Sequence, residues 1–283
     1  MQSEPASGEP ETTIEHRGGD TYFSLGLPIA EHSAERPLPA RLQLIWDASA
    51  SAAGRQFDRE FALLDAYFRR AGTIDVNLVR VADTASPPER YTVRRGDWLA
   101  LRRALEGTVY DGASNLGAVT HDGVSQEALW FTDGLANYGS PWILKFPVPV
   151  FAINSAAAAN PAALRTLAEA SGGRWLDLGA ATPVQASRAL LRRGWQLLDA
   201  TALGAQDVVA QSAHPEEGSL TLAGVMTAPE AALTLRLRAP DGNVVTRVVR
   251  ISAQRNESHL AASQWARIKL GQLPADSRLN RTI

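Results

Sequence analysis

Apolar residues alternate between two spacings from about residue 40 to residue 195. The stretch 42–46, Leu-Gln-Leu-Ile-Trp, is apolar at nearly every position, which is typical of a strand buried on both faces of a sheet. Because side chains alternate along a strand, two sets are predicted to face opposite sides: Leu42, Leu44 and Trp46 on one, Gln43 and Ile45 on the other. After this strand, apolar residues at positions 57, 61, 64 and 68 have helical spacing and predict a helix that ends before Gly72.

The same alternation continues along the chain. Strands are predicted at 73–81, 91–94, 128–132, 147–154 and 174–178, and helices at 98–105, 116–121, 161–170 and 182–191. Strands that alternate with helices favour parallel pairing. The fold class predicted is therefore α/β, with a doubly wound, mostly parallel sheet.

From Trp195 the pattern changes to short runs in which apolar and polar residues alternate. Runs at 219–224, 233–238 and 244–251, with a turn at 239–243, predict a small antiparallel β module. A helix is predicted at 260–273. The resulting domains are a disordered lead (1–20), an α/β domain (21–195), the β module (196–257), and a C-terminal helix and tail (258–283). The abrupt polar ends favour a piece of a longer protein.

Composition excludes several classes. A net charge of −2 over 283 residues argues against a nucleic-acid partner. No apolar run approaches the roughly 18 residues that span a bilayer, so no membrane insertion is expected. The first residues lack the basic-then-apolar plan of a signal peptide. The chain has no cysteine, which excludes disulfides, thiolate metal sites and cysteine nucleophiles.

Candidate chemistry lies where the predicted strands end. Asp47, Ser49 and Ser51 follow the strand at 42–46, Ser114 lies in a glycine-containing loop, and Asp133 follows the strand at 128–132. Ligands of open α/β sheets bind beyond the carboxyl ends of the strands. Carboxylate and hydroxyl oxygens are the ligands that a hard cation such as Mg²⁺ prefers.

These three segments, in this order, resemble the metal-ion-dependent adhesion site of the von Willebrand factor A domain family. The family pattern is an Asp-x-Ser-x-Ser loop, a Thr in a Gly-rich loop, and an Asp in a Thr-Asp-Gly sequence, here residues 132–134. This chain departs from the pattern at three positions. Ser114 stands where the family usually has Thr, and Ala50 and Ala52 replace a frequent Gly and Met; a positive φ at Ala50 would be strained.

The resemblance implies a function. The metal would be Mg²⁺, or Mn²⁺ or Ca²⁺, and it would bind an exposed Asp or Glu of a partner protein. The alternative is a metal-free scaffold within a larger protein. An A domain followed by a β module and a helix is also similar to bacterial proteins of the VIT/inter-alpha-trypsin inhibitor heavy chain type, which implies a cell-envelope or extracellular location. No domain long enough to be the VIT domain precedes the A domain here.

Enzymatic alternatives lack their residues, so no enzyme activity is expected. The five histidines are scattered, and no serine lies in a Gly-x-Ser-x-Gly context. An aspartyl-phosphate phosphatase needs Asp-x-Asp and a later Lys, and no Gly-x-x-x-x-Gly-Lys phosphate loop is present. The pairs Arg94–Arg95 and Arg102–Arg103 are interpreted as solvated faces or a basic patch for acidic partners. Trp142 and Tyr138 are expected to form an exposed rim beside Asp133.

Overall fold

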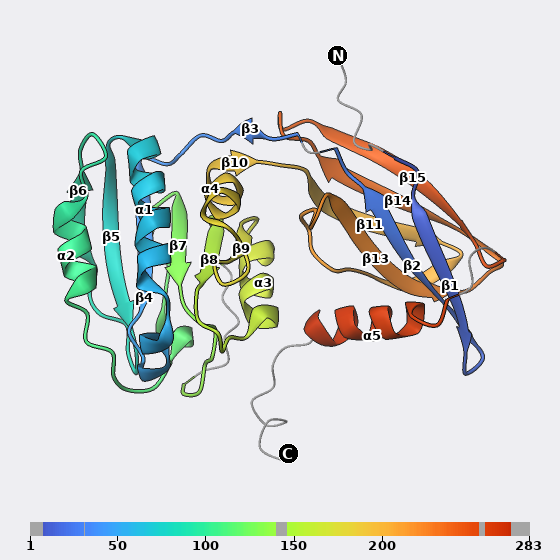
Figure 1. Ribbon diagram of the computed structural model, residues 1–283, viewed down its shortest axis with the longest axis horizontal. Helices are drawn as coiled ribbons and strands as arrows, with labels where there is room; N and C mark the ends of the chain where they lie inside the picture. Colours follow the sequence, from blue (N-terminus) through green and yellow to red (C-terminus); the bar gives the residue numbers. More distant parts are fainter. Residues whose placement is uncertain (1–7, 31, 140–145, 255–257, 273–283) are drawn as a thin grey trace. The chain divides into compact units, whose positions relative to one another are not determined.

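The computed structural model describes residues 8–30, 32–139, 146–254 and 258–272, so Trp142 lies outside the described residues. The chain divides into two compact units. Residues 36–191 form one, here called the α/β unit, and the described residues up to 35 and from 192 to 272 form the other, here called the sandwich unit. The chain therefore leaves the sandwich unit, builds the α/β unit, and returns (Figure 1).

A six-stranded sheet in the order β6-β5-β4-β7-β8-β9 forms the centre of the α/β unit (Figure 1). Its strands are β4 (Arg41–Asp47), β5 (Ile74–Val81), β6 (Glu89–Val93), β7 (Glu127–Phe131), β8 (Val150–Asn154) and β9 (Arg174–Asp177). All neighbouring pairs are parallel except β5 with β6. The predicted fold class, a mostly parallel α/β sheet, is confirmed.

Helices cover both faces of this sheet. They are α1 (Phe57–Ala71), α2 (Leu99–Glu106), α3 (Pro161–Ala170) and α4 (Pro183–Leu191), with the 3₁₀ turns η1 (Ala50–Gly54) and η2 (Leu116–Ala118). The predicted helix at 116–121 is thus only a short 3₁₀ turn. The strand predicted at 147–154 begins at Val150, because Pro147 and Pro149 cannot donate to a ladder.

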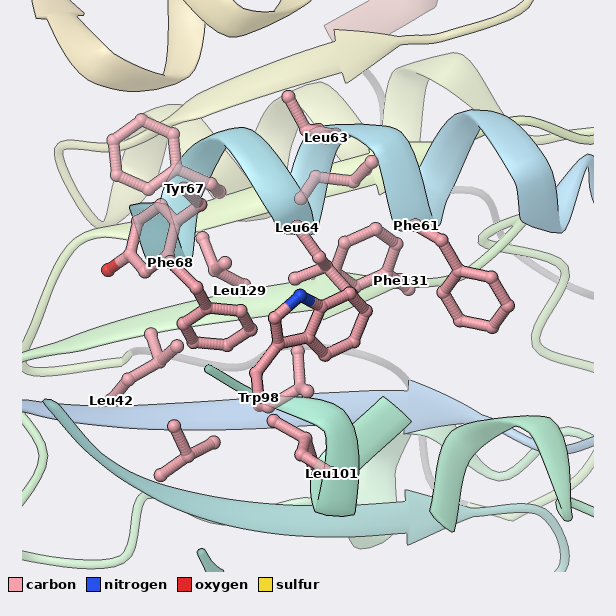
Figure 2. Close-up of a cluster of buried hydrophobic side chains, with 14 of the residues drawn as sticks. Leu42, Phe61, Leu63, Leu64, Tyr67, Phe68, Trp98, Leu101, Leu129 and Phe131 are labelled. Atoms are coloured by element: carbon pink, nitrogen blue, oxygen red, sulfur yellow. The ribbon is translucent and has the colours of Figure 1, made fainter. Parts of the chain in front are cut away.

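Each face of the sheet has its own core. Leu42, Leu44 and Trp46 pack with α1, α2 and α4, whereas Ile45 packs with Trp130 and α3 on the other face. Figure 2 shows the first core, in which Phe61, Leu64 and Phe68 of α1 point toward Trp98 and the sheet. The predicted alternation along β4 is therefore confirmed, and it places Asp47 at the end of a strand that is fixed on both faces.

The sandwich unit consists of two antiparallel sheets with a shared apolar core. One sheet contains β1 (Glu11–Arg17), β2 (Asp20–Pro28), β13 (Ser219–Met226) and β12 (Ala205–Ala210), in that order. The other contains β11 (Gln196–Leu203), β14 (Glu230–Arg238) and β15 (Val244–Ser252). Helix α5 (Ala261–Gln272) packs against the first sheet, where the Trp265 and Tyr22 ring centroids are 5.3 Å apart.

This unit corrects the predicted domain boundaries. Residues 11–17 were expected to be disordered but form β1, and residues 21–28 belong to the sandwich unit instead of the α/β domain. Ile14 is the one apolar residue of β1, and it is fully buried. The other β1 residues are polar, which is why the sequence predicts disorder there. Its order comes from pairing with β2 through a turn at Gly18–Gly19, both with positive φ.

A short ladder forms between the two residues that precede the α/β unit and two residues that follow it. β3 (Ala34–Glu35) pairs antiparallel with β10 (Arg192–Arg193). Beside it, the Arg36 amide donates to the Leu191 carbonyl at 3.4 Å. The polypeptide thus enters and leaves the α/β unit at neighbouring points. Separately, among the described residues no helix is both long and apolar enough to cross a bilayer.

Candidate metal centre at the carboxyl edge of the sheet

The register of two neighbouring strands brings two of the predicted loops together. Trp46 of β4 lies opposite Phe131 of β7 in a parallel pair, so the residues that follow each of them share one edge of the sheet. Asp47 and Thr132 are joined there, because the Thr132 hydroxyl donates to Asp47 Oδ2 at 2.6 Å. Both side chains are buried.

The loop after β4 folds back onto the Asp47 carboxylate. The Ser49 hydroxyl and amide donate to Asp47 Oδ1 at 2.6 and 3.0 Å. Ser49 Oγ lies 3.3 Å from Ser51 Oγ, and Ser51 is exposed whereas Ser49 is buried. The three residues therefore form a connected set of oxygens that runs from the interior to the surface. Ala50, expected to be strained if its φ were positive, is not among the non-glycine residues with positive φ, which are Arg95, Asp207 and Glu217 within the described ranges.

The second loop is held against the first by main-chain hydrogen bonds. The Ala50 amide donates to the Gly112 carbonyl at 3.2 Å, and the Asp111 amide donates to the Ala48 carbonyl at 3.0 Å. Gly112 has a φ of 79°, and a Cβ there would lie 3.0 Å from the Asp83 carboxylate, so a glycine suits this turn. These contacts place Ser114 beside the loop of Asp47.

The third loop completes the rim. Asp133 Oδ1 accepts the Leu135 amide at 2.9 Å, and Asn137 Oδ1 accepts the Ser114 amide at 2.8 Å. Hydrogen bonds therefore join each pair of loops: the Asp47 loop to the Asp133 loop, the Asp47 loop to the Ser114 loop, and the Ser114 loop to the Asp133 loop. The structure brings all five predicted residues, Asp47, Ser49, Ser51, Ser114 and Asp133, to one rim of the sheet.

Two buried oxygens at this rim have no hydrogen-bond partner in the described part of the chain. They are Ser114 Oγ and Asp133 Oδ2. An unpaired buried polar atom costs about 1–3 kcal/mol, and more when it is charged. A hydroxyl and a carboxylate oxygen are ligands that a hard divalent ion prefers, so the chemistry of these residues fits such an ion. The described residues contain no group of three or more His, Cys, Asp or Glu side chains that could hold a metal, so a cation here would depend on hydroxyl oxygens.

The electrostatics of the rim are set by burial. Burial raises the pKa of the Asp47 carboxyl above its ordinary value, and hydrogen bonds from Ser49 and Thr132 offset part of that increase. The positive charge of nearby Arg55 also offsets part of the increase, and the pKa remains above its ordinary value. The ionised carboxylate is thus costly in the folded protein and gains from any additional positive charge.

Sequence reasoning missed the residues that support the rim. The family motif contains Thr132, but no sequence pattern assigns a role to it, to Arg55 or to Glu60. Arg55 and Glu60 have fully buried side chains with Nε and Oε1 3.6 Å apart. A charged residue on an otherwise apolar helical face is the signal that could have found Glu60, since it lies three residues after Phe57 and four before Leu64.

Tyr138 is the described part of the predicted aromatic rim. Its side chain is 60% exposed, and its amide donates to the Ser114 carbonyl at 3.3 Å. An aromatic ring on a fixed backbone beside the candidate site is well placed to contact a partner.

No protein-family model matches the chain, and no protein of curated function matches it. Among solved structures, the ArnB paralog VWA2 from Sulfolobus acidocaldarius has a TM-score of 0.46 and 10% identity, over 93% of this chain and 81% of that one. A von Willebrand factor type A protein from Catenulispora acidiphila has a TM-score of 0.45 and 13% identity, over 92% and 76%. The pilus adhesin SpaC from Lactobacillus rhamnosus GG has a TM-score of 0.30 and 11% identity, over 86% and 47%.

Proposed function

We propose that the α/β unit is a von Willebrand factor A domain that binds a partner protein through a divalent cation, Mg²⁺ first among the candidates. Ser49, Ser51 and Ser114 would supply neutral oxygens, and Asp47 and Asp133 would supply charge directly or through water. When bound, such a cation accepts one more anionic oxygen, which would come from an Asp or Glu of the partner. The role is binding and not catalysis.

The observation that carries this proposal is a pair of buried oxygens, Ser114 Oγ and Asp133 Oδ2, that find no hydrogen-bond partner among the described residues and lie on two loops held together by hydrogen bonds. Each belongs to a residue that the metal-site resemblance selects. A rim built only for structural reasons would have these oxygens hydrogen-bonded or exposed.

Calorimetric titration of the metal-free chain with MgCl₂ and MnCl₂ tests the proposal. The wild-type protein should bind one ion, and Asp133→Asn and Ser114→Ala should weaken binding at least tenfold. Asp75→Asn is the matched control, because Asp75 is an exposed carboxylate on the same sheet whose Oδ1 accepts the Thr92 hydroxyl at 2.8 Å. Equal affinity in wild type, Asp133→Asn and Ser114→Ala would exclude this site.

A metal-free scaffold is the second candidate. One observation favours it: both oxygens of the Asp47 carboxylate accept hydrogen bonds from protein groups, Ser49 and Thr132. In that case the wild-type chain would show no heat of binding with either metal. Capture of a partner would then also be insensitive to EDTA.

A further inference from the structure

A buried guanidinium lies behind the candidate metal centre. The side chains of Arg55 and Glu60 are both fully buried, and Arg55 lies directly after η1, at the end of the loop that carries Ser49 and Ser51. Burying an arginine costs free energy unless ion pairs, hydrogen bonds and ring contacts offset the loss of hydration. The contacts of Arg55 indicate what that is.

Arg55 contacts the ends of the two strands that lead into the acidic loops, β4 and β7. Its Cζ lies 4.4 Å from the ring centroid of Trp46, which precedes Asp47. Its Nη1 donates to the main-chain carbonyl of Phe131 at 2.5 Å, two residues before Asp133. One planar group thus fixes the last residue before each acidic loop.

Glu60 in turn holds Arg55 and a third strand end. Glu60 Oε1 accepts the Ser155 hydroxyl at 2.6 Å, and Ser155 directly follows β8. Ser155 Oγ also accepts the Gln56 amide at 2.7 Å, which anchors the residue after Arg55. The pair therefore connects the ends of three neighbouring strands, β4, β7 and β8.

Arg55 does not take the place of a cation at the carboxylates. Within the described part of the chain it forms no hydrogen bond to Asp47 or Asp133, and its Nε and Nη2 are buried without a hydrogen-bond partner. A guanidinium that only neutralised the two acids would donate to them directly. Its contacts are the hydrogen bond to backbone, the aromatic rings and the ion pair with Glu60.

We infer that Arg55 is a positioning residue of the cation site, one that holds the Asp47 and Asp133 loops in binding geometry through its bond to Phe131 and its stacking on Trp46. This inference rests on the proposed function. Groups that support metal ligands from behind typically change metal affinity 10- to 100-fold when they are replaced. Lysine keeps the charge but not the planar, stacking fork, so Arg55→Lys should not restore affinity.

The test is calorimetric titration of the full chain with MgCl₂, comparing wild type with Arg55→Met and Arg55→Lys. Arg59→Met is the matched control: Arg59 lies four residues later, on α1, and its Nη1 also donates to a main-chain carbonyl, that of Leu178. We expect at least tenfold weaker binding in both Arg55 variants and wild-type affinity in the control. Urea unfolding with and without MgCl₂ adds a readout that general destabilisation would not move. The increase in midpoint caused by the ion should shrink in the Arg55 variants.

The outcomes distinguish failure of the positioning role of Arg55 from failure of the proposed metal-binding function. Wild-type affinity in folded Arg55→Met overturns the positioning role, as does an equal ion-dependent increase in midpoint in all proteins. Wild-type affinity in Arg55→Lys with weakened Arg55→Met would assign the effect to charge, which also overturns it. If Arg55→Met does not give a native circular-dichroism spectrum, Arg55→Lys alone decides. Absence of binding in the wild-type protein overturns the proposed function itself, and this inference with it.

Discussion

Replacing Thr132 by valine tests the junction between the two acidic loops. Valine keeps the β-branched shape of threonine and removes only the hydroxyl. That hydroxyl donates to Asp47 Oδ2 at 2.6 Å and accepts the Gly134 amide at 3.0 Å, in a fully buried setting. Loss of a charge-assisted bond costs about 1.5–3 kcal/mol and loss of the amide's acceptor about 1 kcal/mol, so the free energy of unfolding should fall by about 3 kcal/mol.

The loss should depend on pH, because it acts on an ionised carboxylate. Burial already raises the folded-state pKa of Asp47, and removing the Thr132 hydrogen bond, which lowers that pKa, should raise it further. When the pKa of an acid is higher in the folded state than in the unfolded state, where it is about 3.9, stability is lost as pH rises. The loss begins near the unfolded-state pKa and is complete above the folded-state pKa. The difference between wild type and Thr132→Val should therefore be larger at pH 7 than at pH 4.

Urea unfolding in EDTA at both pH values measures this. The control is Thr92→Val, which removes a similar hydrogen bond to a carboxylate, 2.8 Å from Asp75 Oδ1, at an exposed site. Its effect should stay within about 0.5 kcal/mol. Similar losses in the two variants, or a Thr132→Val loss that is the same at pH 4 and pH 7, would refute the reasoning.

Two further predictions concern the α/β unit. Burial by itself would raise the pKa of Asp122, but hydrogen bonds from Asn77 and Ser125 outweigh it and lower the pKa to about 2. The free energy of unfolding of the wild-type protein should therefore fall by about 2 kcal/mol between about pH 4 and pH 2. It should fall by less in Asp122→Asn, and urea unfolding at a series of acidic pH values measures the difference. The Tyr67 hydroxyl donates to buried Glu127 Oε1 at 3.0 Å, so Tyr67→Phe should cost about 1–2 kcal/mol in urea unfolding. Tyr91→Phe, which loses an exposed bond to Glu89, should cost less than half of that; equal losses would contradict the burial argument.

The sequence predicted the α/β unit well because its pattern is local. Each strand is a short apolar run, and each helix has a continuous apolar face, so neighbouring residues alone define the element. Four of the five rim residues were placed at one edge of the sheet from sequence, since they lie at or just after the ends of β4 and β7, whereas Ser114 was selected only by the family pattern. Whether they bind a metal remains a prediction.

Non-local pairing explains what sequence missed. Residues 11–17 are mostly polar, and β1 forms because β2 pairs along its whole length. The membership of β1 and β2 in the sandwich depends on β13, about 200 residues further along, which no local pattern reports. Arg55 and Glu60 were missed for a similar reason: their partners, Phe131 and Ser155, lie 76 and 95 residues away.

The ladder between Ala34–Glu35 and Arg192–Arg193 has a mechanical consequence. Tension applied to residues 28 and 196 would pull both arms from the same end of this ladder and open its residue pairs one after another. Only then would load reach Arg36, which donates to the Leu190 carbonyl and to the Glu127 carboxylate. The loops around Asp47 would stay folded while the β3–β10 pairs open. A ligand bound at this rim would therefore stay bound during the first extension of the chain.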